Sequence, residues 1–149
     1  MFKFELNSVL SLKEKFEDAK KRELGHANTY KEALDLQKEV LVNEYEGIYH
    51  AIKNNSTQEV NIRAIKALNR YSSHISKQII EAEVHIVQAQ KVVDIKREEL
   101  LNAMKERKIL DNLKEIKLEQ YIEESKKVEQ LLLDEIVSYK YGAEGRGVN

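Results

Sequence analysis

The sequence predicts an all-α protein, a long antiparallel coiled-coil hairpin in which the second helix is longer than the first. Apolar residues recur at alternating steps of three and four along most of the 149-residue chain, which is the spacing of a left-handed coiled coil. Proline is absent, glycine occurs five times and charged residues make up 34%, a composition typical of long solvated helices. One short polar stretch near residue 55 interrupts the pattern and predicts the reversal of the chain.

The first helix is expected over about residues 6–53. Asn7 or Ser8 is the candidate N-cap, because a short polar side chain can accept a hydrogen bond from a free amide of the first turn. Gly25 and Gly47 lie inside the helix and cost about 1 kcal/mol each relative to alanine. They mark either a close approach of two backbones or tolerated weak points, and we favour the second interpretation. The expected seam has steps of three and four: Val9, Leu12, Phe16, Ala19, Glu23, Ala27, Tyr30, Leu34, Gln37, Leu41, Tyr45, Ile48 and Ile52.

The reversal is expected at residues 54–56. Asparagine is favoured at helix ends, and Ser56 with Glu59 three residues later forms a capping-box pattern that would start the second helix at residue 57. A turn this short sends the chain back along itself, so the two helices should pair antiparallel. We therefore expect one elongated domain over residues 1–149.

The second helix is expected over about residues 57–140. Its seam holds ten apolar residues of twelve, Ser72 and Lys96 being the exceptions: Ile65, Leu68, Ser72, Ile75, Ile79, Ala82, Ile86, Ala89, Val93, Lys96, Leu100 and Ala103. Residues 70–74 are a weaker interruption where a kink could lie. Residues 141–149 hold three of the five glycines, which predicts a flexible tail.

The lengths of the two helices leave part of the second helix without a partner. About 36 of its residues extend past the first helix in a simple hairpin. The register slips between Arg107 and Lys117, as at a stutter, and a different apolar stripe follows: Leu118, Ile122, Ser125, Val128, Leu132, Ile136 and Tyr139. Exposed apolar stripes mark binding surfaces, so this overhang should bind another molecule.

Composition excludes several classes of protein. With 25 basic and 26 acidic residues, the chain lacks the basic balance of a nucleic-acid binder. No cysteine is present, so neither a disulfide nor a thiolate nucleophile is available. The first residues are too polar for a signal peptide, and no run is apolar enough to span a membrane. We expect a soluble cytoplasmic protein without direct membrane insertion.

No constellation of residues predicts catalysis or cofactor binding. The Glu-x-x-His step of di-iron helical proteins occurs once, at Glu23 and His26, whereas such sites need two copies. Phosphate-binding loops and nucleophile elbows are absent from the sequence, and carboxylates on an open rod lack the burial that tunes a pKa. We expect no catalytic, cofactor-binding or metal-ligating residues. A metal-dependent helical enzyme is the alternative that metal analysis would test.

Two blocks of the sequence carry a family resemblance that spans the whole chain. The first block is the start, with paired aromatic residues before the first heptad: Phe2, Phe4, Leu6, Val9, Leu10, Leu12, Lys13, Glu17 and Asp18. The second block lies late in the chain: Ala103, Arg107, Lys108, Leu110, Asp111, Leu113, Lys114, Glu115, Tyr121, Gln130, Asp134 and Glu135. Together with the length and the break near residue 55, these blocks resemble the bacterial flagellar export protein family FliJ.

The resemblance implies a cytoplasmic component of the flagellar type III protein export apparatus, peripheral to the inner membrane through that apparatus. Members resemble the coiled-coil stalk of rotary ATPases. They bind the hexameric export ATPase and promote its ring assembly, contact the cytoplasmic domain of the export gate protein, and some escort export chaperones. The implied partner-binding residues are ten members of the two blocks: Phe2, Phe4, Leu6, Val9, Leu10, Arg107, Lys108, Leu110, Leu113 and Tyr121. The alternative function is a generic homodimeric coiled-coil spacer or tether.

Overall fold

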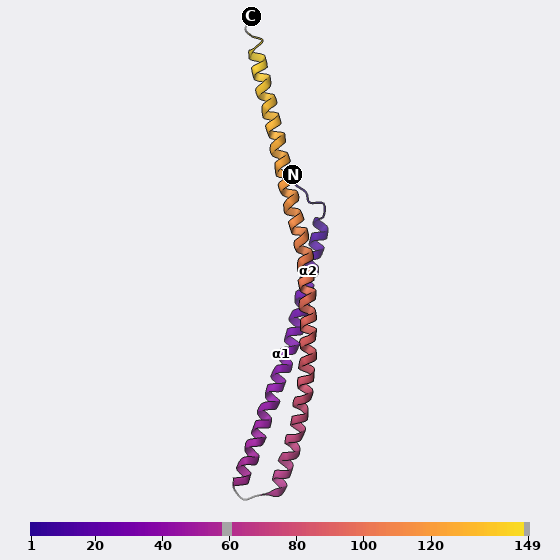
Figure 1. Cartoon of the computed structure of the whole chain (residues 1–149), viewed down its shortest axis with the longest axis vertical. Coiled ribbons are helices and arrows are strands. Elements are labelled where there is room, and N and C mark those ends of the chain that lie inside the picture. Colours follow the sequence, from indigo (N-terminus) through magenta and orange to yellow (C-terminus); the bar gives the residue numbers. More distant parts are fainter. Residues whose placement is uncertain (58–60, 148–149) are drawn as a thin grey trace. The chain divides into compact units, whose positions relative to one another are not determined.

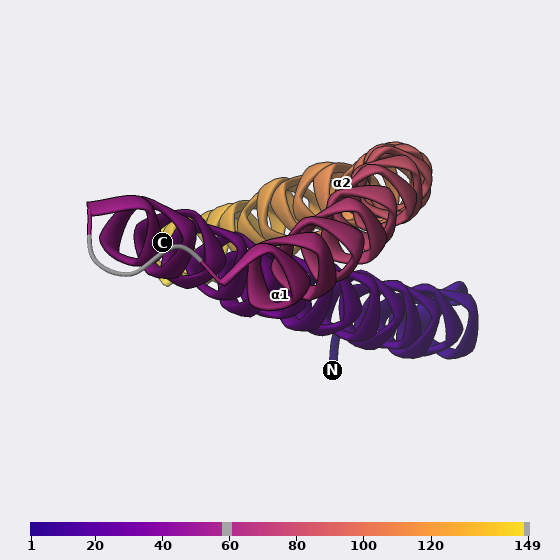
Figure 2. The same ribbon diagram turned by 90° about the horizontal axis from the view of Figure 1, so that it is seen from below.

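Two helices make up the computed structural model, which describes residues 1–57 and 61–147 (Figure 1). Helix α1 spans Asn7–Thr57 with 51 residues, and α2 spans Ile62–Glu144 with 83 residues. Both are continuous coiled ribbons in the two views (Figures 1 and 2), and the described residues contain no strand. The predicted all-α hairpin with a longer second helix is confirmed.

The chain forms two compact units. Unit 1 comprises Met1–Phe16 and Ala103–Asn149, and unit 2 comprises Glu17–Asn102. Each unit therefore takes one part from α1 and one part from α2. The single domain expected over residues 1–149 stays a prediction.

Ion pairs in unit 2 show that its two helical parts run antiparallel. Lys20 Nζ lies 3.1 Å from Glu99 Oε2, and Lys38 Nζ lies 3.3 Å from Glu83 Oε1. As the residue number rises along α1, the number of its partner along α2 falls. This is the pairing that a short connection between two helices produces.

Helix α1 ends later than the sequence predicted. Residues 54–56 belong to α1, so the turn expected there and the start of the second helix at residue 57 are both wrong. Glu59 and the side chain of Ser56, the two members of the proposed capping box, lie outside the described residues. The N-cap of α2 is instead Asn61: its Oδ1 accepts a hydrogen bond from the amide of Ala64 at 3.4 Å, and its carbonyl accepts one from Ile65 at 3.1 Å.

The outer ends of the helices also differ from expectation by a few residues. The Leu6 carbonyl accepts the first bond of α1, from the Leu10 amide at 2.9 Å, so neither Asn7 nor Ser8 is the N-cap. At the other end, residues 141–144 are helical and not part of a tail. Gly142 costs helix stability but does not stop a helix as proline would. Residues 70–74, where the sequence allows a kink, lie within α2.

The predicted seam of α2 is confirmed by burial. All twelve of its positions are buried or half-buried, including the two polar exceptions. Val93 is the most enclosed, with 1% of its surface exposed, and Ala103 follows with 2%. A strict repeat of seven therefore identified the paired face of α2 without knowledge of its partner.

The predicted seam of α1 is wrong in its first turns. Val9, Leu12 and Phe16 are exposed by 39%, 65% and 47%. The buried or half-buried positions start one residue later and include three charged side chains: Leu10, Lys13, Glu17, Lys20 and Leu24. Tyr30, Gln37 and Tyr45 are likewise exposed. The sequence pattern favours the more apolar stripe for the seam. Charged side chains can occupy seam positions instead, because their aliphatic stems pack in the seam while their charged ends form ion pairs across it.

Candidate functional site

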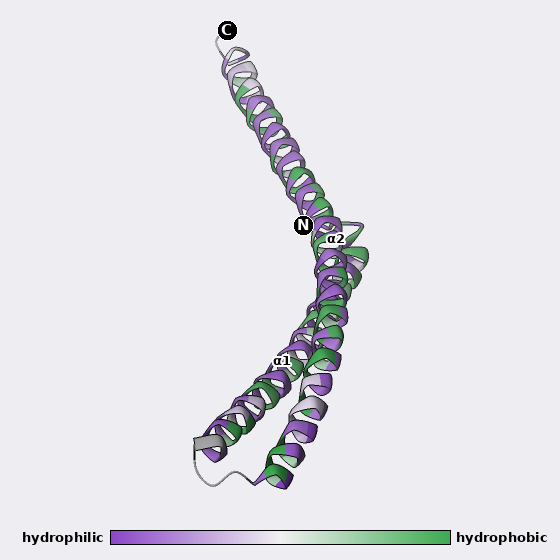
Figure 3. Ribbon diagram, turned by 60° about the horizontal axis from the view of Figure 1, so that its bottom comes forward, coloured by the Kyte–Doolittle hydropathy of each residue, from purple (hydrophilic) through white to green (hydrophobic). Residues whose placement is uncertain are grey.

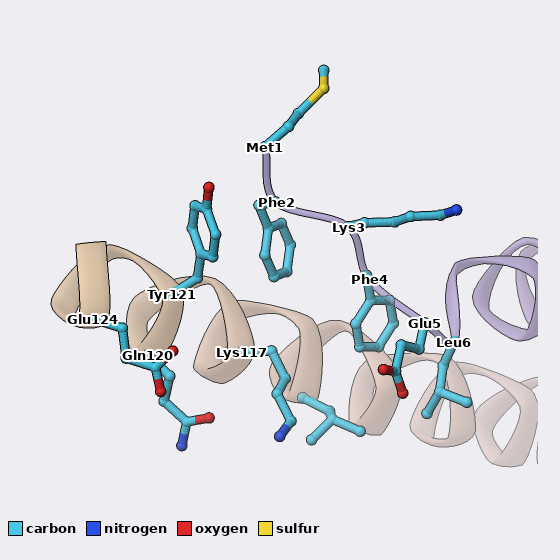
Figure 4. A pocket seen from close by; sticks show the side chains of 11 residues that line it. Met1, Phe2, Lys3, Phe4, Glu5, Leu6, Lys117, Gln120, Tyr121 and Glu124 are labelled. Atoms are coloured by element: carbon cyan, nitrogen blue, oxygen red, sulfur yellow. The ribbon is translucent and has the colours of Figure 1, made fainter. Parts of the chain in front are cut away.

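The N-terminal segment of unit 1 lies against α2 through aromatic residues (Figure 4). The ring of Phe2 faces that of Tyr121, with centroids 5.6 Å apart and planes inclined by 51°. Phe4 is buried, at 8% exposed. A turn in which the Asn7 amide donates to the Phe4 carbonyl at 3.2 Å leads from this segment into α1. Alternating Phe2 and Phe4 therefore attach the start of the chain to α2.

An open groove of about 480 Å³ lies along this contact. Residues 1–6 form one wall, and Leu113, Lys117, Gln120, Tyr121 and Glu124 form the other. A hydrogen bond with the N-terminal amino group, and the positive charge of that group, lower the pKa of the Tyr121 phenol. The groove combines two aromatic rings with charged rims, which suits a polypeptide segment better than a buried small molecule.

Unit 1 contains the whole second sequence block and all of the first block except Glu17 and Asp18. Phe4 and Leu10 are buried and pack inside the unit, whereas Leu6, Val9, Lys108 and Tyr121 are exposed. Phe2, Leu110 and Leu113 are half-buried. Arg107 is also half-buried and forms an ion pair with Asp111 one turn later on α2. The residues that can meet a partner without unpacking the unit are therefore the four exposed ones.

The end of α2 is the larger exposed surface. Every residue from 126 to 147 is exposed. The predicted stripe is exposed along its length, from 39% at Leu118 through 54% at Leu132 to 81% at Tyr139, with Ser125 half-buried. Hydrophobic bands recur along this part of α2 in Figure 3. We call residues 126–144 the bare segment.

Sequence reasoning missed how wide the apolar surface of the bare segment is. Four exposed apolar residues lie outside the predicted stripe: Leu131, Leu133, Val137 and Tyr141. At about 100° per residue, they place apolar groups on most sides of the helix. Charged side chains such as Glu129, Asp134 and Lys140 lie between them, so the segment is apolar on several sides without being apolar all round. The sequence signal for this wide apolar surface is the run of three adjacent leucines at 131–133, because three consecutive residues cannot all lie in one seam.

A four-residue charge cluster joins α1 and α2 in unit 2. Lys20 Nζ donates to Glu99 at 3.1 Å, and Lys96 Nζ donates to Glu23 at 3.1 Å. The hydrogen bond from Lys96 lowers the pKa of Glu23, and that from Lys20 lowers the pKa of Glu99. The same bonds raise the pKa of each lysine. The cluster contains a single pair of carboxylates, and each is neutralised by lysine.

The described residues contain no group of three or more side chains that could hold a metal ion. The one Glu-x-x-His step places Glu23 in the charge cluster and leaves His26 exposed. Neither helix, over its described residues, contains a stretch long and apolar enough to cross a membrane.

These features define a class of protein: a paired-helix protein whose second helix carries exposed apolar residues along 126–144. The family model described as Flagellar FliJ protein matches residues 2–146, and the chain belongs to this family. The protein is accordingly a component of the flagellar export apparatus, and the family is non-enzymatic. Comparisons with curated proteins and with solved structures returned no match.

Proposed function

We propose that the protein binds the hexameric export ATPase through the bare segment of α2 and promotes assembly of its ring. The observation that supports this proposal is the exposure of apolar residues on most sides of that segment. One partner helix would cover a stripe, and the residues on the other sides would stay in water. A ring that surrounds the segment would cover all of them, as the stalk of a rotary ATPase is covered.

The cytoplasmic domain of the export gate protein and the export chaperones are the further partners of this proposal. The groove beside Phe2 and Tyr121 supports a second contact, because its aromatic rings are partly accessible and belong to unit 1 outside the bare segment. Through these partners the protein would lie at the inner membrane without entering it. The protein acts in this proposal as an assembly factor and not as an enzyme.

Co-purification with the export ATPase tests the proposal. Leu132→Asp with Ile136→Asp changes two exposed positions one turn apart, at 54% and 56% exposure. This variant should lose ATPase binding and the stimulation of ring assembly, while far-UV circular dichroism stays at the wild-type level. The matched control is Leu36→Asp with Val40→Asp on α1, which has the same spacing and exposures of 63% and 64%. Equal binding by wild type and the Leu132/Ile136 variant would remove the bare segment from the function.

A further inference from the structure

One side of the bare segment carries no charged residue. At about 100° per residue, five residues of the segment share a sector of the helix surface that is about 80° wide, and no charged residue of the segment falls within it. The four larger side chains of this sector are each more than half exposed. We call the sector the uncharged face, and its members are Val128, Leu132, Ile136, Tyr139 and Ala143.

Glutamates border the uncharged face on both sides. By the same geometry, Glu129 lies about 20° beyond one edge of the face, and Glu135 lies about 20° beyond the other edge. Two of the three lysines of the segment, Lys126 and Lys127, lie about 80° or more from the face. The third, Lys140, lies about 40° beyond the edge that Glu129 borders, near the end of the helix. The face is therefore bordered mainly by acid.

The acids of this part of α2 are not neutralised within the chain. Residues 118–144 hold seven acidic and three basic residues, and among the described residues none of these acids forms an ion pair. In the preceding part of α2, by contrast, Glu106 lies 2.8 Å from the Nζ of Lys13, and Asp111 pairs with Arg107. An apolar face bordered by unneutralised acid is complementary to an apolar surface bordered by cations.

We propose that the uncharged face binds an amphipathic helix of the partner whose apolar stripe is bordered by lysine or arginine side chains. This inference rests on the proposed function and names the chemistry of the ring surface that covers this side of the bare segment. A helix fits the face because apolar residues at steps of three and four give both partners a stripe of similar width. A second copy of this chain suits the face less, because it brings the same excess of acid.

Charge reversal at the edges of the face tests the proposal by calorimetric titration of the full chain with the export ATPase. Glu129→Lys with Glu135→Lys should weaken binding by roughly tenfold or more, because two attractive charge contacts become repulsive. The matched control is Asp134→Lys with Glu144→Lys, which makes the same change in net charge on exposed positions away from the face. It should weaken binding by no more than about threefold at about 0.15 M ionic strength, since distant charges are screened.

Far-UV circular dichroism of both variants should match wild type, because all four positions are exposed. Equal losses by the two variants would show that binding responds to net charge alone and would overturn the proposal. Unchanged binding by Glu129→Lys with Glu135→Lys would overturn it as well.

The salt dependence of binding gives a second readout of the same contacts. Wild-type affinity should fall as the ionic strength rises from about 0.1 M to about 1 M, because the Debye length shrinks from about 10 Å to about 3 Å. Glu129→Gln with Glu135→Gln removes the two charges without reversing them and should show a clearly weaker dependence. The same salt dependence in wild type and in this variant would contradict a cationic border on the partner helix.

Leu132→Asp with Ile136→Asp separates failure of this inference from failure of the proposed function. Loss of binding by that variant, with full binding by Glu129→Lys with Glu135→Lys, would keep the bare segment as the binding site and overturn the cationic helix. Full binding by both variants would overturn both proposals.

Sedimentation equilibrium of the free protein tests the other occupant of the face. A monomer at micromolar concentration supports a helix from a different protein. Self-association that Leu132→Asp with Ile136→Asp abolishes would assign the uncharged face to a second copy of this chain and overturn the proposal.

Discussion

Lys96 shows how a charged residue can occupy a coiled-coil seam. It is half-buried on the paired face of α2, where its ammonium group meets Glu23 of α1 and Glu99 one turn later on α2. Lys20 completes the arrangement, so that each carboxylate accepts a hydrogen bond from both lysines. A polar layer of this kind favours one register, because a shifted register would leave charges in the seam without partners.

The charge cluster should make stability depend on pH at both extremes. The pKa values of Glu23 and Glu99 are lowered in the folded state, so their contribution is present above the ordinary value of 4.5 and is lost as the pH falls through the folded values. The pKa values of Lys20 and Lys96 are raised, so their contribution is present below 10.5 and is lost as the pH rises through the folded values.

Thermal unfolding of Glu23→Gln with Glu99→Gln across pH measures this contribution. The variant should melt below wild type near neutral pH, and the difference should shrink steadily at pH values below 4.5. A difference that stays constant down to pH 2 would show that the carboxylate charges are not responsible.

Val93 provides the sharpest test of the seam because it has a matched neighbour. Val93→Ala removes two buried methyl groups and should lower the free energy of unfolding by about 2 kcal/mol. Val92→Ala makes the same chemical change at a position that is 47% exposed and should cost well under half as much. Chemical denaturation of both variants gives the comparison, and equal losses would contradict the assigned paired face.

At the scale of the helices, sequence reasoning identified the elements and their order but not their ends. The polar residues from Asn54 to Asn61 offer several local caps of similar energy, so the pattern alone does not choose among them. The structure selects Asn61, whose side chain bonds the Ala64 amide. In α1 the stripe of Val9, Leu12 and Phe16 is more apolar than the true seam. Which of the two stripes faces α2 depends on the α2 charges that lie opposite, and the sequence of α1 alone does not contain this information.

Removing the cap of α2 tests its assignment. Asn61→Ala should lower the free energy of unfolding by about 1 kcal/mol, the usual cost of losing an N-cap. Asn69→Ala, in the exposed interior of α2, should be neutral or slightly stabilising because alanine is the better helix former. Thermal or chemical unfolding separates the two, and a neutral Asn61→Ala would place the cap elsewhere.

At the scale of the whole molecule, the length difference between the helices predicted that part of α2 would lack a partner within the chain. The structure agrees, since residues 126–147 are exposed throughout. The resemblance in the two sequence blocks led to the family that the comparison over residues 2–146 establishes. Pattern reasoning could not show that Phe2 packs on Tyr121, because that contact joins residues 119 positions apart in the sequence.

Partner binding by the bare segment is the central claim, and hydrogen–deuterium exchange of the full chain with and without the export ATPase tests it most directly. Amides of residues 126–144 should exchange rapidly in the free protein, and they should become strongly protected in the complex. The amides of unit 2 around Val93 should change little. Protection confined to unit 2, with the bare segment exchanging as fast in the complex as in the free protein, would contradict the account.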